Sequence, residues 1–262
     1  MLVFAAIAPH PPLLIPSVGK NNLEKLKQTA EAMKALEQEM YIARPDTLVI
    51  VSPHGNVLPD AFTINLAAQY TISLKEFGDH QTTASFRSDF MLIDKIQRAM
   101  RRDTSLSLSS EEVLDYGVSV PLLLLSAHLP TISLVPMAPA GLDYKAHYEF
   151  GDKLKEEIMN SNKRIAFIAS ADLSHTLTNN APGGFSKKGA ALDAKVVELI
   201  KTKDTDGLLA LDTEMCQASK ECGLRPISIL LGLLARMAYE PKIHSYEGPF
   251  GVGHLVANMV LP

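Results

Sequence analysis

The sequence has only two cysteines among its 262 residues, no tryptophan and no excess of positive charge. Two cysteines cannot form a disulfide framework in a chain of this length, so we expect a reduced, cytoplasmic protein. The formal net charge is -4, and no block of lysine and arginine stands out. A protein without clustered positive charge binds the phosphate backbone of nucleic acids weakly, which argues against nucleic acid as a partner.

Long hydrophobic runs are also missing. A membrane-spanning helix needs about 20 consecutive apolar residues. The nearest approach, VSVPLLLLSAHLPTISLVP, is interrupted by Pro121, His128 and Pro130. The apolar N-terminus has neither the basic residues nor the small-residue cleavage site of a signal peptide. We therefore expect no association with a membrane.

The chain is instead typical of a globular protein, with 47% hydrophobic and 21% charged residues. Strands are predicted at residues 2–8, 46–53, 61–67, 131–137, 164–171, 242–248 and 254–261, and helices at 21–43, 88–102, 117–128, 144–161, 186–202, 205–215 and 225–239. Nearly continuous apolar strands between helices indicate a sheet that is covered on both faces. We predict one three-layer α/β/α domain over residues 1–262, around a mostly parallel or mixed central sheet.

Three of the eight histidines follow predicted buried strands. His10 lies between prolines at the end of the first strand, in APHPP, and His54 follows the second strand in VSPHG. His175 follows a third strand in IASADLSH. Proline cannot continue a sheet ladder, so the strands end there and the histidines sit in stiff loops. In an open α/β sheet, ligands bind at the carboxyl ends of parallel strands, so these histidines are expected to share a site.

Two neutral imidazoles are the beginning of a transition-metal site, and a third ligand is expected just before the apolar helix, in ECGLRP. Glu221 would complete the two-histidine, one-carboxylate triad of non-haem Fe(II) oxygenases. Cys222 would instead favour zinc or copper. A structural alternative is that Glu221 only stabilises the helix N-terminus and that Cys222 is a small buried residue. His175, if it does not bind the metal, is suited to proton transfer.

Six motifs together resemble the class III extradiol ring-cleavage dioxygenase family, of the protocatechuate 4,5-dioxygenase catalytic-subunit type. They are, in order, APHPPLLIP, DTLVIVSPHGNVLPDAF, LDYGVSVPLLLL, IASADLSHTL, ECGLRPISILLGLL and YEGPFGVGH. They run from residue 8 to residue 254, which is nearly the whole chain. The closer similarity is to the AmmeMemoRadiSam or Memo-like branch.

This resemblance implies a single α/β domain with Fe(II) at the edge of the sheet and an aromatic diol and O2 as substrates. By the same resemblance, His10 and His54 are ligands, Glu221 is the best match for the carboxylate, and His175 takes a proton from a catechol hydroxyl. The resemblance also implies a homodimer or a pairing with a second subunit.

The sequence departs from the family at one catalytic position. Ring-cleaving members have a histidine in an Asp-His-Gly motif, whereas this chain has Asp115-Tyr116-Gly117. Tyr116 can donate a hydrogen bond, but an ordinary phenol with a pKa near 10 is a poor proton shuttle. In Memo-like relatives a cysteine near position 222 binds metal. The alternative hypotheses are therefore an iron or copper redox protein without ring cleavage, and a zinc hydrolase that uses the same ligands.

Overall fold

The computed structural model describes residues 1–262, and its centre is a sheet of almost entirely buried, apolar strands. The strands are β1 (Leu2–Ala8), β2 (Thr47–Val51), β3 (Phe62–Asn65), β4 (Gln69–Ile72), β5 (Ser85–Ser88), β6 (Leu106–Ser109), β7 (Val113–Leu114), β8 (Ser133–Ala138), β9 (Ile165–Ser170), β10 (Glu240–Glu247) and β11 (His254–Val260). The α-helices are α1 (Pro16–Gly19), α2 (Lys27–Ala43), α3 (Phe90–Met100), α4 (Tyr116–Leu125), α5 (Tyr144–Met159), α6 (Lys187–Thr202), α7 (Thr205–Leu209), α8 (Thr213–Ser219) and α9 (Leu224–Leu233). Short 3-10 helices are η1 (Pro12–Leu14), η2 (Lys20–Leu26), η3 (Lys75–Phe77) and η4 (Pro249–Gly251).

The sheet is mixed, with a parallel centre. Its order is β10-β11-β1-β9-β2-β8-β5-β4-β7, and β3 pairs with both β8 and β6. The neighbours β1, β9, β2 and β8 run parallel, whereas β11 is antiparallel to β1 and β10 is antiparallel to β11. The predicted α/β fold with a mostly parallel or mixed sheet is confirmed.

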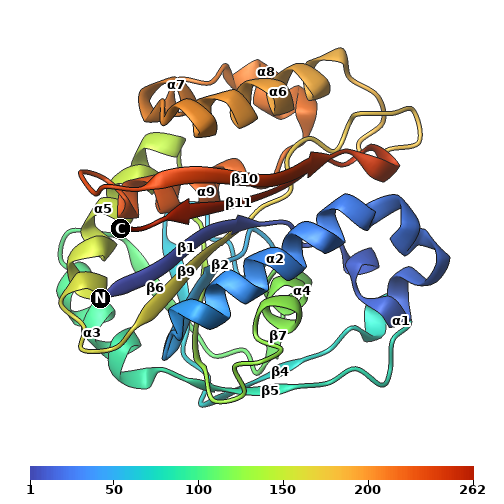
Figure 1. The fold of residues 1–262 in the computed structure, drawn as a ribbon. Coiled ribbons are helices and arrows are strands. Elements are labelled where there is room, and N and C mark those ends of the chain that lie inside the picture. Colours follow the sequence, from blue (N-terminus) through green and yellow to red (C-terminus); the bar gives the residue numbers. More distant parts are fainter.

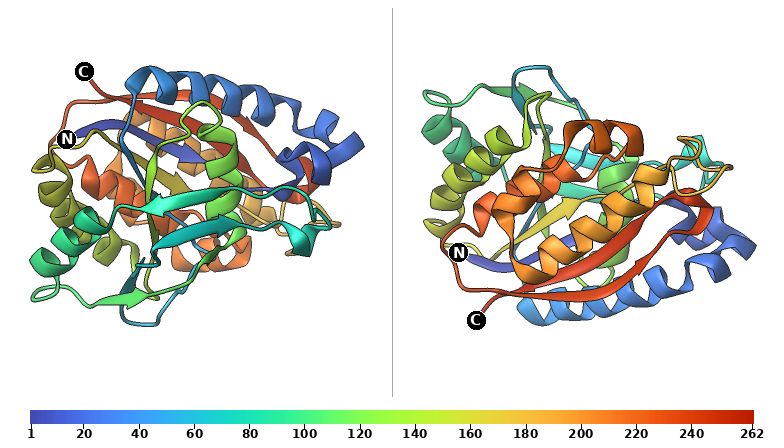
Figure 2. Two further views of the ribbon diagram at one scale, coloured as in Figure 1. Left: turned by 90° about the horizontal axis from the view of Figure 1, so that it is seen from below. Right: turned by 90° about the horizontal axis from the view of Figure 1, so that it is seen from above.

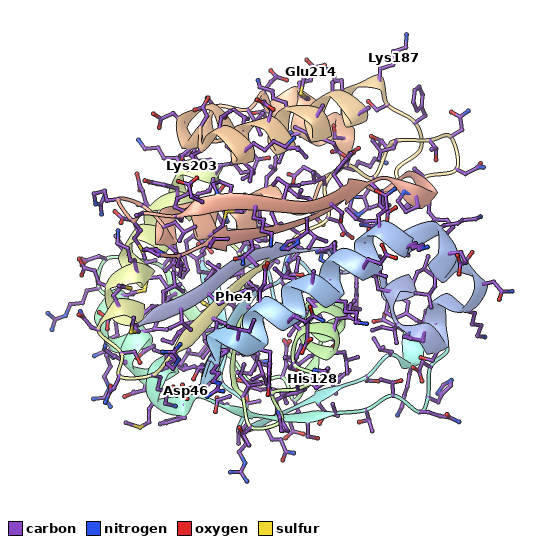
Figure 3. The ribbon with its side chains drawn as sticks, viewed as in Figure 1. Phe4, Asp46, His128, Lys187, Lys203 and Glu214 are labelled. Carbon is purple, nitrogen blue, oxygen red and sulfur yellow. The ribbon has the colours of Figure 1, made fainter.

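Side chains of the central strands alternate between two hydrophobic cores. On β9, Phe167 joins the core that contains α5 and α9, while Ile168 joins the core that contains α2 and α4. Successive strand residues point to opposite faces, so both faces of these strands must be covered. Helices accordingly lie on both sides of the sheet (Figures 1 and 2). Phe4 of β1, labelled in Figure 3, belongs to the core that contains α2.

An outer layer of helices lies beyond β10. It is formed by α6, α7 and α8, and the charged side chains of Lys187, Lys203 and Glu214 extend from it (Figure 3). None of the helices in the protein is both long and apolar enough to cross a lipid bilayer.

The observed elements differ from the predicted ones in four unpredicted strands and in the bounds of two helices. Strands β4, β5, β6 and β7 were not predicted, because segments such as SFRS and LSLS contain too few apolar residues for a strand pattern; their pairing with neighbours decides their conformation. The helix predicted at 205–215 is two helices, because Asp212 accepts a hydrogen bond from the amide of Met215 and so begins α8. The helix predicted at 21–43 begins as η2 and becomes α-helical only at Lys27.

The parallel strands bring the loops that follow β1, β2 and β9 to one edge of the sheet. Because β1, β9 and β2 run in the same direction, their carboxyl ends at Ala8, Ser170 and Val51 lie on the same side of the domain. The loops after these strands carry the three histidines that the sequence singles out.

Candidate metal centre

Three potential metal ligands converge at this edge, namely His10, His54 and Cys222. Their ligand atoms all lie within 4.8 Å of one another. The two imidazole Nε2 atoms are 3.1 Å apart, and Cys222 Sγ is 3.6 Å from His10 Nε2. A tetrahedral ion with metal–nitrogen bonds of about 2.0–2.1 Å and a metal–sulfur bond of about 2.3 Å separates such atoms by roughly 3.3–3.6 Å. The separations of His10 Nε2 from the other two ligand atoms are therefore close to those between ligands of one metal ion.

The tautomer of His10 is set by a hydrogen-bond relay. The Ser170 hydroxyl donates to the carbonyl oxygen of Gly117 at 2.5 Å, so it accepts a proton from His10 Nδ1, which is 2.8 Å away. His10 Nε2 therefore carries a lone pair, as a metal ligand must. His10 is only 1% exposed, and burial lowers the pKa of its imidazole to about 4. The relay and the burial together keep His10 neutral and oriented.

His54 is held by the loop that leads into α4. Its backbone amide donates to Ser52 Oγ, and the Ser52 hydroxyl donates to Asp115 Oδ1, which also accepts from an amide in the first turn of α4. Gly117 is required for this approach, because a Cβ there would lie 2.3 Å from Ser52 Oγ. Burial lowers the pKa of His54 as well.

Cys222 reaches the two histidines because Gly223 lies against the end of β9. A Cβ on Gly223 would lie 2.7 Å from both the carbonyl oxygen of Asp172 and the Cβ of Ala171. Burial raises the pKa of the Cys222 thiol well above its ordinary value, so a thiolate there requires a nearby cation. Two neutral imidazoles and a thiol suit iron, zinc or copper, and the residues present fit such an ion.

Glu221 does not join this group. Its Oε1 accepts a hydrogen bond from the hydroxyl of Tyr144 at 3.1 Å, and its Oε2 accepts from the amide of Leu224 at 2.7 Å. The carboxylate therefore caps the start of α9. The expectation that Glu221 is the third ligand disagrees with this geometry, which brings its neighbour Cys222 to the imidazoles instead.

Asp172 and His254 form a buried pair beside the three ligands. Asp172 Oδ1 accepts from the backbone amide of His10 and lies 3.0 Å from His254 Nδ1, while its Oδ2 is 3.4 Å from His10 Nε2. Burial alone would raise the pKa of Asp172, but the neighbouring imidazoles of His10 and His254 hold it below its ordinary value. The sequence interpretation assigned neither residue to the site. The position of Asp172 two residues after a buried strand was the available signal.

The two predicted catalytic residues lie at the same edge. The hydroxyl of Tyr116 is 2.9 Å from His54 Nε2, and the two rings stack with centroids 4.4 Å apart. His175 Nδ1 donates to the carbonyl oxygen of Leu173 at 3.1 Å, which leaves its Nε2 with a lone pair. Burial is the main cause of the lowered pKa of His54, and His175 lowers it further. His175 also helps His10 and His254 to lower the pKa of Asp172.

Among the comparisons with known proteins, a family model shows the family and a solved structure shows the fold. A family model described as "Catalytic LigB subunit of aromatic ring-opening dioxygenase" matches residues 4–257. Protein CA_C1420 of Clostridium acetobutylicum is 27% identical over 263 residues; the match covers 97% of this chain but only 56% of that protein. The crystal structure of the uncharacterized protein JW3007 from Escherichia coli K12 superposes with a TM-score of 0.71 at 16% identity, over 98% of this chain and 99% of that one.

The relay to His10 predicts the effect of Ser170→Ala. Without an acceptor for its Nδ1 proton, His10 loses its fixed tautomer, so we expect metal affinity to fall by about 10- to 100-fold. Metal competition with a chromophoric chelator measures this. Ser126→Ala is the matched control, because Ser126 is a buried serine that bonds only within α4. Equal affinities of the two variants would contradict the role of the relay.

Burial of His10 also predicts how the stability of the metal-free protein depends on pH. The folded-state pKa of about 4 lies below the unfolded value of 6.5. Between these values the unfolded chain binds a proton that the folded chain excludes. The free energy of unfolding should therefore fall as the pH decreases from about 6.5, by up to about 1.4 kcal/mol per pH unit from this residue. Urea denaturation of the wild type and His10→Gln tests this, and identical pH slopes would contradict it.

Proposed function

Because this chain belongs to the family of catalytic LigB subunits of aromatic ring-opening dioxygenases, we propose that it is a non-haem Fe(II)-dependent dioxygenase of the extradiol type. Its substrates are a catechol-like aromatic diol and O2, and the product is the opened ring. The observation that carries the proposal is the approach of His10 Nε2 to His54 Nε2, 3.1 Å apart at the carboxyl edge of the sheet.

In the proposed reaction, one set of residues binds a cation and another residue accepts a proton. His10 and His54 present neutral nitrogens, and Cys222 is the third donor. Fe(II), when bound there, would supply the binding point and the electron transfer that link the diol to O2. These donors would thus hold the reactants together in one orientation.

His175 is the proposed proton acceptor. The hydrogen bond from its Nδ1 to the carbonyl oxygen of Leu173 fixes the ring and leaves Nε2 free to accept a proton from a diol hydroxyl. Neutral imidazole is well matched to this task near pH 7. Asp172, buried and held in its anionic form, favours the imidazolium that results.

This assignment predicts that His175→Ala binds iron like the wild type but loses turnover. General base catalysis contributes about 10²- to 10⁴-fold, so oxygen uptake with a panel of substituted catechols should fall by at least about 100-fold. Iron binding is measured as the iron content of the protein. Turnover is measured as oxygen consumption and as the absorbance of the ring-opened product. His80→Gln is the control, because His80 is exposed and lies in a bend between η3 and β5. Loss of iron from His175→Ala would show that the assigned role is wrong.

A second candidate function is supported by the thiol of Cys222 in the ligand group and by the phenol of Tyr116 beside it. Both favour a protein that binds iron or copper and manages its redox state without cleaving a ring. Soft thiolate ligands select Cu(I), whereas carboxylates do not.

Competition between metals separates the two candidates. If the redox function is correct, the wild type should prefer Cu(I) over Fe(II), Cys222→Ser should lose that preference, and Glu221→Gln should retain it. Glu221→Gln is the matched control because it changes the adjacent residue, whose side chain bonds to Tyr144 and Leu224. A preference for Fe(II) together with oxygen uptake would favour the dioxygenase.

A further inference from the structure

We propose that Tyr116 is a fourth metal ligand and that its phenolate oxygen binds the ion directly when the metal is ferric. The inference rests on the metal centre formed by His10, His54 and Cys222. It goes further by giving the phenol a coordinating role in place of proton transfer, which changes the donor set to two nitrogens, one sulfur and one oxygen.

The first support is the position of the hydroxyl. Tyr116 Oη is 2.9 Å from His54 Nε2, which is itself 3.1 Å from His10 Nε2. These separations are close to the roughly 3.2–3.3 Å between neighbouring nitrogen and oxygen ligands of a tetrahedral ion with bonds of about 2.0 Å. The phenol oxygen thus lies at about the distance from His54 Nε2 that a further ligand of the same ion would have.

The second support is that the ring is held in place. Tyr116 is the first residue of α4, which Asp115 caps through its side chain. One face of the phenol stacks on His54, at an interplanar angle of 25°. Phe77 and His10 meet the phenol edge to face, at 5.4 and 5.7 Å between centroids. Contacts on several sides therefore hold the hydroxyl beside His54 Nε2.

The third support is the hydrogen bond that a metal would displace. The hydroxyl of Tyr116 has one hydrogen-bond partner, His54 Nε2. A cation that binds His10 and His54 takes the lone pair of this nitrogen, so the phenol loses its hydrogen bond. The oxygen of Tyr116 then faces the cation with its own lone pairs, and a proton released to solvent balances the new metal–oxygen bond.

Asp172 is another anionic group beside His10, and one of its two carboxylate oxygens is already engaged. Its Oδ1 accepts from the backbone amide of His10 and bonds to the ring of His254, while its Oδ2 lies 3.4 Å from His10 Nε2. The phenol oxygen differs from this carboxylate because it lies against the other imidazole, 2.9 Å from His54 Nε2. A hard phenolate oxygen favours ferric over ferrous iron, so Tyr116 would stabilise the oxidised site.

Resonance Raman spectroscopy of the oxidised iron protein tests the proposal. Protein is loaded with Fe(II) without oxygen, its iron is counted, and the metal is oxidised with ferricyanide. A visible charge-transfer band with ring modes of a coordinated phenolate is expected in the wild type. Tyr116→Phe should lose these modes entirely. Tyr239→Phe should keep them, because Tyr239 lies beneath Lys203 at the far end of α6, away from the site.

The outcomes separate this inference from the proposed function. Bound iron without phenolate modes in the wild type, or modes that persist in Tyr116→Phe, would overturn the ligation by Tyr116 and leave the metal centre standing. A wild-type protein that binds no iron would overturn the iron site on which the proposed dioxygenase function depends, and the inference with it. Tyr116→Phe removes a single oxygen atom, and its thermal unfolding temperature checks that the fold is retained.

Discussion

The close approach of two imidazole nitrogens in a buried site is the constraint on which the rest of this structure depends. His10 Nε2 and His54 Nε2 are 3.1 Å apart, and burial disfavours the charged form of both rings. Two lone pairs that face each other repel unless a proton or a cation lies between them. The fold holds the rings there through Ser170, Ser52 and the ends of two strands, so the two nitrogens are placed where they could share one cation.

Each level of the fold contributes to that approach. Parallel pairing brings the carboxyl ends of β1, β9 and β2 to one edge. The alternation of side chains between two cores fixes the register of these strands, because a slip of one residue would exchange the two faces. Helices α4 and α9 begin at the same edge; Tyr116 is the first residue of α4, and Cys222 lies two residues before the first residue of α9. Gly117 and Gly223 allow both helix starts to lie against the strand ends.

The sequence predicted the parts of the site that depend on local pattern. His10 and His54 follow apolar strands and prolines, and strand ends of a parallel sheet converge, so their pairing could be inferred. The choice between Glu221 and Cys222 could not, because it depends on how closely Gly223 approaches Asp172, a contact between residues 51 positions apart. The same holds for His254, which contacts Asp172 across 82 positions. Strands β5 and β6 were missed because their order comes from pairing rather than from an apolar pattern.

X-ray absorption at the iron K-edge of the reconstituted protein tests the central claim most directly, because it reports the atoms bound to the metal whether or not a substrate is known. The account predicts one sulfur neighbour together with the scattering pattern of imidazole rings, and it predicts that the sulfur disappears in Cys222→Ser while the imidazole pattern remains. A shell of nitrogen and oxygen alone in the wild-type protein would contradict the site formed by His10, His54 and Cys222.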